Sequence, residues 1–586
     1  MHKLIKLFLA NKSLGLSALV LLLICQNVYS QDENRGRFSG NLESNGNFFI
    51  EDTDIGAANT PQYDHQLFGA DAWLQLNYSV KGFDMGLRFD LFNNSNLLNP
   101  QGSYTDQGIG RWFIKKKIHK LGISAGYLYD QIGSGIIFRA YEQRPLLIDN
   151  ALYGVRLTYD LAENWEVKAF TGRQKLQFDT YGSIIKGISI DGFLSGGGED
   201  GKKFWSMAPG FGIVNRTIDD QSMNTVVSTI NTYSVVDSIG AKYNTYAFSA
   251  YNTLTFGDFS WFVEGAYKTE EVFFDPFAIK TNRDGSQVPG KLVFDDGYVL
   301  YSSVSFAKKG LGITLEGKRT SNFTFRTNPL VTLNRGMINF LPPMTRVNTY
   351  RLLARYSPAV QELGEQAIQF DIRYSPKRKL SFNVNVSFIN DLKSNGLYRE
   401  LYTEVLYKYK RKWQIQGGVQ LQEYNQEIYE TKPEKGSLGT VTPYLEFLYK
   451  LSRKKALRFE LQYMHTGREV MEAGQRFNDG LYGNTNRDFG NWIFGLVELS
   501  LAPHWTFTVS DMFNVSPDFK NDVIPVDNNG EKEKIHYPRF DIYYTFKANR
   551  ISLSYIKQVE GIVCAGGVCR LEPAFSGVKL GVSSTF

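Results

Sequence analysis

Polar and apolar residues alternate along much of this chain. Residues 380–388, LSFNVNVSF, show the pattern: the Leu, Phe and Val side chains fall on one face of an extended segment, and the Ser and Asn side chains on the other. The same alternation occurs in residues 74–80, 85–91, 368–374, 457–463, 540–546 and 578–582. A period of two residues is typical of a β-strand whose two faces meet different surroundings, so the sequence predicts an all-β fold.

The connections between these segments alternate in length. Short links lie at residues 81–82, 119–120, 162–164, 257–259, 308–310, 375–379, 410–412, 451–455, 502–504 and 547–549. Longer polar stretches lie between them, at residues 51–66, 94–109, 131–149, 179–243, 273–296, 326–364, 391–397, 425–438, 468–488, 515–536 and 560–572. This pattern predicts one antiparallel transmembrane β-barrel of about 22 strands, with short periplasmic turns and long extracellular loops. The stretch 179–243 is long enough to contain another hairpin.

The start of the chain carries an export signal. Three lysines precede the apolar run 14–25, and Val28-Tyr29-Ser30 then offers small or tolerated residues for cleavage. We therefore expect a signal peptide over residues 1–30 and a single outer-membrane barrel domain over residues 31–586.

Composition and the end of the chain agree with a barrel in the outer membrane of a Gram-negative bacterium. Aromatic residues make up 14% of the chain, with 42 Phe and 34 Tyr, as expected of β-structure. Residues 576–586 form an alternating segment that ends on Phe586. This ending resembles the C-terminal insertion signal of outer-membrane barrels, so we expect outer-membrane lipid and the barrel-assembly machinery as partners.

Positive charge gathers at the predicted short turns. The residues concerned are Lys115, Lys116, Lys117, Lys377, Arg378, Lys379, Arg453, Lys454 and Lys455. One interpretation places these side chains beside the phosphates of the inner leaflet. The other is a basic periplasmic ring that docks an acidic partner, such as a periplasmic or secretion-system protein. The formal charge of +6 is explained by these turns and does not indicate nucleic-acid binding.

One long stretch is rich in arginine, whereas some other predicted loops are rich in acidic residues. Residues 326–364 contain Arg326, Arg335, Arg346, Arg351 and Arg355 against a single acid, Glu362. The stretch could be an ordinary surface loop with local structure. Alternatively, it folds inward and forms a lumen constriction, where the arginines meet lumenal carboxylates or an anionic solute.

A barrel of this size has a wide lumen that needs a plug. The mature sequence before the first strand, near Gly36, is too short for a plug domain. Plugging is therefore expected from the longest loops, from lumenal side chains or from a separate protein. The sequence contains no H-E-x-x-H, G-x-S-x-G or phosphate-loop motif, and its His residues are isolated. We expect no enzyme activity and no cofactor.

Several stretches resemble a known family. They include FSGNLESNGNFFIEDTD near the start, YDQIGSGIIFRAYEQRPLLIDNALYGVRL, GEQAIQFDIRYSP and the CAGGVC stretch near the end. Together they are similar to a family of uncharacterised outer-membrane β-barrel proteins from Bacteroidota. The resemblance implies a location and a fold, and no assigned activity. Bacteria of this group also secrete proteins through large barrels, which makes a secretion-associated role conceivable.

Two classes of function fit these observations. The first is a porin-like or gated channel for a solute that the sequence does not identify. The second is an envelope scaffold or secretion-associated barrel that binds partner proteins. Ion conductance or liposome swelling by the purified protein would distinguish the channel from the scaffold.

The remaining chemistry lies in two cysteines near the end of the chain. Cys564 and Cys569 flank Gly566-Gly567 in VCAGGVCR. A zinc site would need further nearby ligands, and a redox pair is usually C-x-x-C at a helix start. We therefore predict a disulfide between Cys564 and Cys569 that fixes the tip of the last extracellular loop.

Overall fold

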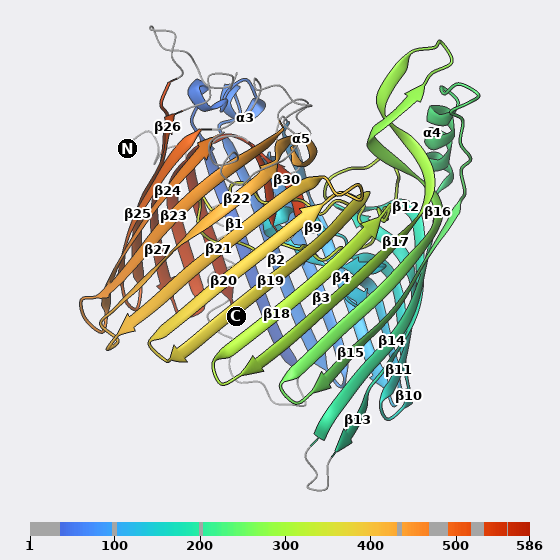
Figure 1. Ribbon diagram of the computed structural model, residues 1–586, viewed down its shortest axis with the longest axis horizontal. Helices are drawn as coiled ribbons and strands as arrows, with labels where there is room; N and C mark the ends of the chain where they lie inside the picture. The colour runs from blue at the N-terminus through green and yellow to red at the C-terminus, as the bar shows by residue number, and fades with distance from the viewer. Residues whose placement is uncertain are drawn as a thin grey trace.

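The fold is a single closed β-barrel. A computed structural model of the chain describes residues 36–96, 102–197, 203–430, 436–467, 490–516, 533–558, 561–565 and 567–586. In this part of the chain, 24 antiparallel strands form the wall (Figure 1). The all-β antiparallel barrel expected from the sequence is thus confirmed, with a strand number close to the expected one. The predicted signal peptide, residues 1–30, lies outside the described residues.

The wall strands follow one another around the barrel in chain order. The first half comprises β1 (Arg37–Phe49), β2 (Phe68–Val80), β3 (Phe83–Ser95), β4 (Tyr104–Ile118), β5 (Leu121–Leu128), β10 (Leu152–Ala162), β11 (Trp165–Leu176), β12 (Asp179–Gly192) continued by β13 (Leu194–Gly197), β14 (Lys203–Thr217), β15 (Asn244–Phe256), β16 (Phe259–Thr281) and β17 (Gln287–Lys308). The second half comprises β18 (Leu311–Ser321), β19 (Gly364–Lys377), β20 (Leu380–Asn390), β21 (Gly396–Tyr409), β22 (Trp413–Asn425), β23 (Ser437–Lys450), β24 (Lys455–Gly467), β25 (Asn491–Leu501), β26 (Trp505–Ser516), β27 (His536–Phe546), β28 (Asn549–Gln558) and β31 (Phe575–Thr585).

The first and last strands close the barrel. β1 pairs with β31, with Asn41 opposite Thr585 and Phe49 opposite Gly577. At the end of the chain, the Phe586 amide donates to the Gly40 carbonyl at 3.0 Å, and the Gly40 amide donates to the Phe586 carbonyl at 2.8 Å. Closure leaves the wall without a free edge strand among the described residues, as a structure surrounded by lipid requires.

The barrel wall is apolar outside and polar inside. On β20, Phe382 and Phe388 are 37% and 49% exposed, whereas Asn385 and Ser387 on the opposite face are 1% and 0% exposed. Leu, Ile, Val and aromatic side chains are likewise exposed on the other strands. An apolar exterior around a closed barrel matches a bilayer, so the protein is an integral outer-membrane barrel. No helix among the described residues is long and apolar enough to cross a membrane.

The difference from about 22 strands arises in residues 179–243. This stretch is not one loop: β12 begins only two residues after β11, and the chain reverses between β13 and β14. Ile184 and Ile185 in β12 place apolar side chains on both faces and break the alternation. The remaining connection, residues 218–243, contains the helix α4 (Asp220–Ile230).

Residues 273–296, also expected as a loop, instead extend β16 and β17 as a paired ribbon. The pairing continues to Thr281 opposite Gln287. α4 packs against this ribbon through a small apolar cluster that includes Val226, Val272 and Leu292. Figure 1 shows the ribbon and α4 projecting together above one side of the barrel.

The other long connections contain short elements, some of which lie within the barrel and some at its upper end in Figure 1. They are η1 (Thr53–Ile55), α3 (Pro61–Asp64), β6 (Asp130–Ile132), β7 (Phe138–Ala140), β8 (Glu142–Gln143), η2 (Arg144–Leu146), β9 (Ile148–Asp149), α5 (Gln426–Tyr429), β29 (Gly561–Ala565) and β30 (Val568–Glu572). The largest buried apolar cluster joins residues of these connections, such as Ile55 and Ile137, to inward-facing wall residues such as Val214 and Met464. The lumen therefore holds a hydrophobic core of its own.

Candidate functional site

The connection between β18 and β19, residues 322–363, fills much of the lumen, and we call it the inner segment. Phe323, Phe325, Ile338, Leu352 and Leu353 in this segment are all 0% exposed. Four of them belong to the cluster that also contains wall residues of many strands. The chain thus supplies a plug from one of its own long loops.

Neutral side chains of the wall hold the second half of the inner segment. The Leu352 amide donates to Gln462 Oε1 at 2.7 Å. Gln420 Nε2 donates to the Leu353 carbonyl at 3.3 Å, and Gln422 Nε2 to the Tyr356 carbonyl at 2.5 Å. These glutamines face the lumen from β22 and β24, because the alternation turns their apolar neighbours outward. They satisfy backbone groups of a segment that has no regular secondary structure.

Charged side chains of the wall hold the first half of the inner segment. Lys268 Nζ donates to the Thr324 carbonyl at 2.7 Å, and Arg216 Nη1 to the Arg326 carbonyl at 3.0 Å. Both cations also pair with Glu271, at 2.5 and 2.8 Å.

A third charged contact lies further along this half. Lys318 Nζ donates to the Pro342 carbonyl at 2.5 Å and pairs with Glu365 at 2.8 Å. The side chains of Lys318 and Glu365 are 0% and 1% exposed, so each charge depends on the other.

The five predicted constriction arginines lie at separate places. Arg326 makes two hydrogen bonds to Glu362, at 2.9 and 3.0 Å, within the inner segment itself. Arg346 stacks over the Tyr402 ring at 3.8 Å and lies 3.9 Å from Glu404. Arg355 stacks over Trp492 at 4.2 Å.

The other two arginines differ in their surroundings. Arg335 lines a cavity described below, and Arg351 is exposed. The inner segment therefore brings Arg346 and Arg355 to wall residues and does not gather the five arginines into one ring. A constriction role for these residues stays a prediction.

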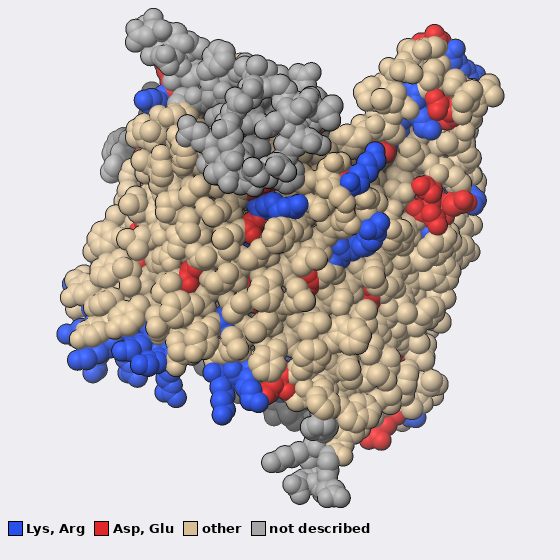
Figure 2. All heavy atoms as spheres, in the orientation of Figure 1, with Lys and Arg blue, Asp and Glu red and all other residues tan. Residues whose placement is uncertain are grey.

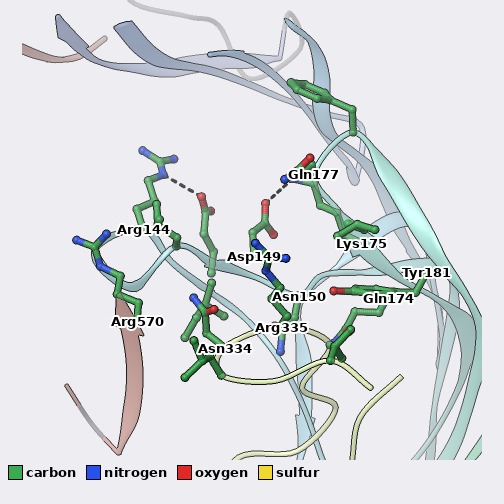
Figure 3. A pocket seen from close by; sticks show the side chains of 18 of the residues that line it. Arg144, Asp149, Asn150, Gln174, Lys175, Gln177, Tyr181, Asn334, Arg335 and Arg570 are labelled. Atoms are coloured by element: carbon green, nitrogen blue, oxygen red, sulfur yellow. Dashed lines mark hydrogen bonds and ion pairs between the residues drawn. The ribbon is translucent and has the colours of Figure 1, made fainter. Parts of the chain in front are cut away.

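A cavity of about 480 Å³ lies between the inner segment and the wall of β2, β3, β11 and β12 (Figure 3). Its floor is an ion-pair network around Arg88, which is 2% exposed. Arg88 pairs with Asp90 at 2.6 Å, with Glu142 at 2.8 Å and with Asp149 at 2.7 Å. Trp73, Phe92, Phe178 and Tyr181 supply aromatic surface to the same cavity.

Asp149 is the anionic centre of this cavity. Its carboxylate accepts hydrogen bonds from Arg88, from Lys175 and, at 2.8 Å, from Tyr129. Burial alone would raise the pKa of Asp149, but the charges of Lys175 and Arg88 outweigh it and lower that pKa to about 2.

Arginines from three connections complete the cavity. Arg144 pairs with Glu142 at 2.8 Å and with Glu43, and it lies over the Trp73 ring. Arg570, from β30, pairs with Glu572 at 2.7 Å. Nε and Nη1 of Arg570 are buried without a hydrogen-bond partner among the described residues. Figure 3 shows Arg144, Arg335 and Arg570 around the same space, so the cavity offers both cations and carboxylates to a polar solute.

Sequence reasoning found only part of this cavity. The alternation of residues 85–91 places Arg88 and Asp90 on the polar face of a strand. This alternation does not indicate that Glu142 and Asp149, more than 50 residues later in the chain, pair with Arg88. These partners come from a connection whose inward path is set by tertiary packing.

The predicted basic turns gather at the short-turn end of the barrel. Lys377, Arg378, Lys379, Arg453, Lys454 and Lys455 are all exposed, in the turns β19–β20 and β23–β24 on either side of the turn β21–β22. Lys115, Lys116 and Lys117 belong instead to the last residues of β4, where Lys117 pairs with Asp160 at 2.7 Å. Figure 2 shows lysine and arginine side chains clustered at the lower rim of the visible face.

The cysteine stretch forms a hairpin, as expected from Gly566-Gly567. β29 pairs with β30, and Cys564 lies opposite Cys569. The hairpin does not form an outward tip: Val568 is buried with Leu146 and Met337, and the Val360 amide donates to the Gly567 carbonyl at 3.0 Å. The two cysteine side chains lie outside the described residues, so the disulfide stays a prediction.

Among the described residues, no group of three or more His, Cys, Asp and Glu side chains is placed to hold a metal ion. The site that remains is the cavity beside the inner segment.

Solved structures at low identity share features of this fold. The siderophore receptor PirA from Pseudomonas aeruginosa has a TM-score of 0.40 and 8% identity, covering 96% of this chain and 81% of that one. The outer membrane transporter YddB from Escherichia coli has a TM-score of 0.38 and 8% identity, covering 94% and 81%. The ferric citrate transporter FecA has a TM-score of 0.42 and 11% identity, covering 96% and 79%. No curated protein matches the chain. The model described as "Family of unknown function (DUF6029)" matches residues 10–586.

Proposed function

Since this chain belongs to the Family of unknown function (DUF6029), we propose its function from its own geometry: gated passage of a small charged solute across the outer membrane. The observation that carries this proposal is the inner segment, whose buried residues pack in the lumen and leave a charged cavity of about 480 Å³ against the wall. A cavity of this size suits a small molecule.

The contacts of the inner segment support a gate. Its backbone is held by single lysine, arginine and glutamine side chains of the wall, and no wall strand pairs with it in a ladder of hydrogen bonds over residues 342–360. Each neutral contact of this kind contributes about 1 kcal/mol, because water replaces it when the segment withdraws. The wall strands keep their own pairing in either state, so the barrel can open without unfolding.

Conductance of the purified protein in planar bilayers tests the proposal. The variant replaces residues 332–356 with a short Gly-Ser linker and is compared with the wild-type chain. We expect brief, rare openings for the wild type and a steady, much larger conductance for the variant. Resistance to SDS before heating checks that both chains have formed the barrel. A folded variant that conducts no better than the wild type, and takes up no labelled amino acid or sugar phosphate into liposomes, would falsify the proposal.

An envelope scaffold is the second candidate, because the lumen contains a packed apolar core. If the protein is a scaffold, neither the wild type nor the linker variant conducts ions, and replacing residues 332–356 changes only the stability of the barrel. The bilayer experiment therefore separates the two functions.

Several finer features belong to the same proposal. Export uses the signal peptide of residues 1–30, and Phe586 is recognised by the barrel-assembly machinery. The apolar belt contacts outer-membrane lipid, and the source is a member of the Bacteroidota. The chain acts without enzyme activity, cofactor or nucleic acid, and a disulfide joins Cys564 to Cys569.

A further inference from the structure

Three neighbouring turns at the short-turn end form an exposed cationic surface, which we call the basic arc. They connect β19 to β20, β21 to β22 and β23 to β24, which are adjacent in the wall. The arc comprises Lys377, Arg378, Lys379, Lys408, Lys410, Arg411, Lys412, Lys450, Arg453, Lys454 and Lys455, all of them exposed.

The charge of the basic arc is uncompensated. Residues 374–383, 405–416 and 447–458, which contain the three turns, include no Asp or Glu. None of the arc residues forms an ion pair with any acid in the described part of the chain. Elsewhere on the same rim, some cations are neutralised: Lys117 pairs with Asp160 at 2.7 Å, and Lys308 with Asp258 at 3.0 Å. The three adjacent turns of the arc thus concentrate cations without a nearby acid on one side of the barrel mouth.

The basic arc also has a shape that can hold side chains. A groove of about 440 Å³ runs between its turns, lined by six arc residues together with Trp413, Gln414 and Leu448. Lys408 and Lys450 share their strand faces with Tyr402 and Tyr444, whose side chains are buried in the lumen. These two lysines consequently face the mouth of the barrel rather than the surrounding lipid.

Backbone conformation adds to this evidence. Lys410 and Arg411 belong to the three-residue connection 410–412 between β21 and β22, and their φ values are 42° and 60°. Positions of positive φ favour Gly, because a residue with a side chain is strained there. Two cations occupy the turn despite that cost.

We propose that the basic arc docks an acidic segment of a partner protein at the periplasmic mouth of the barrel. A surface that served only lipid phosphates would extend around the whole rim, since lipid surrounds the whole barrel. The arc instead covers one side, turns some of its cations toward the mouth and gives them no acidic partner among the described residues. Charge complementarity of this kind speeds association and weakens with salt.

Binding of a fluorescein-labelled 16-residue polyglutamate peptide tests the proposal. The full chain is placed in nanodiscs of pure phosphatidylcholine, and fluorescence anisotropy is measured at 50 and 300 mM salt. The arc variant combines Arg378→Gln, Lys410→Gln, Arg411→Gln and Lys454→Gln. The control removes the same charge elsewhere on the rim through Lys81→Gln, Lys116→Gln, Lys120→Gln and Lys547→Gln.

We expect the arc variant to bind the peptide about tenfold more weakly than the wild type at low salt, and the control about as tightly as the wild type. Equal losses in the two variants would overturn the proposal, because any positive rim would then suffice. A second measurement repeats the comparison in discs that contain phosphatidylglycerol. If the arc substitutions abolish binding of phosphatidylglycerol to the barrel but leave the affinity for the peptide unchanged, the arc is a lipid site and the proposal is wrong. All substitutions lie in exposed turns or at strand ends, and resistance to SDS before heating verifies folding.

Discussion

Lys318→Met removes one wall contact of the inner segment and is expected to open the lumen. Lys318 donates to the Pro342 carbonyl and pairs with Glu365, and both side chains are buried. Without Lys318, the Glu365 carboxylate stays buried and unpaired as long as the inner segment is in place. When the segment withdraws, water hydrates this carboxylate. The substitution therefore penalises only the closed state.

The size of this penalty follows from the burial of the pair. Removing one partner of a buried ion pair costs about 3–5 kcal/mol. Since every 1.4 kcal/mol changes an equilibrium constant about tenfold, the ratio of open to closed chains rises by roughly two to three and a half orders of magnitude. Replacing both residues, in Lys318→Met/Glu365→Gln, removes the unpaired charge. The ratio of open to closed chains should then return most of the way to its wild-type value. The side-chain amide oxygen of this double variant can still accept a hydrogen bond from the Gln361 amide, as the Glu365 carboxylate does at 2.8 Å.

Single-channel conductance measures the open fraction, and limited trypsin digestion in liposomes provides an independent readout. Trypsin should cleave faster after Arg346, which is half-buried over the Tyr402 ring, once the inner segment withdraws. Lys308→Met is the matched control, because Lys308 pairs with Asp258 at an exposed turn where an ion pair contributes at most about 1 kcal/mol. If folded Lys318→Met protein shows the conductance and the digestion pattern of the wild type, the inner segment is not a gate held by this contact.

Three further outcomes are expected. Asp149 has its pKa lowered to about 2, so its stabilising contribution is complete above the ordinary pKa of about 4 and is lost as pH falls from 4 to 2; the temperature at which the barrel loses its resistance to SDS should fall over that range, and the Asp149→Asn variant should be less stable than the wild type at pH 7 and lose less stability between pH 4 and 2. In intact unreduced cells, a maleimide should label neither Cys564 nor Cys569 until a reductant is added; labelling of both before reduction excludes the disulfide. Phe586→Ala should lower the amount of SDS-resistant barrel in the membrane several-fold without changing synthesis, and an unchanged amount refutes the role of Phe586 as an insertion signal.

The wall of the barrel could be predicted from the sequence because its rules are local. Strand alternation places Phe382 outside and Asn385 inside through a period of two residues alone. The prediction failed where local signals are ambiguous. Between β11 and β12 the connection is only Gln177 and Phe178, and the Ile184-Ile185 pair hides the alternation of the strand that follows.

The interior could not be predicted in the same way. The contacts that hold the inner segment join residues distant in sequence, such as Leu352 to Gln462 and Lys268 to Thr324. A glutamine on a lumenal face is equally compatible with water and with a backbone partner, so its residue type does not reveal its contact. The arginine-rich composition of residues 326–364 drew attention to the right segment, but the side chains that close the lumen are largely apolar ones.

The two halves of the inner segment are held by different chemistry, and this difference predicts the order in which they open. Lys268, Arg216 and Lys318 hold the first half through charged hydrogen bonds, each worth about 1.5–3 kcal/mol, whereas the glutamines of the second half contribute about 1 kcal/mol each. Residues 346–360 should therefore exchange their amide hydrogens faster than residues 323–342.

Two variants test this order by hydrogen exchange and mass spectrometry. Gln462→Leu leaves the Leu352 amide without its acceptor and should accelerate exchange in residues 346–360 alone. Lys268→Met leaves Glu271 paired with Arg216, removes the hydrogen bond to the Thr324 carbonyl and should accelerate exchange in residues 323–342. If both variants accelerate both halves equally, the inner segment moves as one unit, and the separate strengths of its neutral and charged contacts do not set its opening.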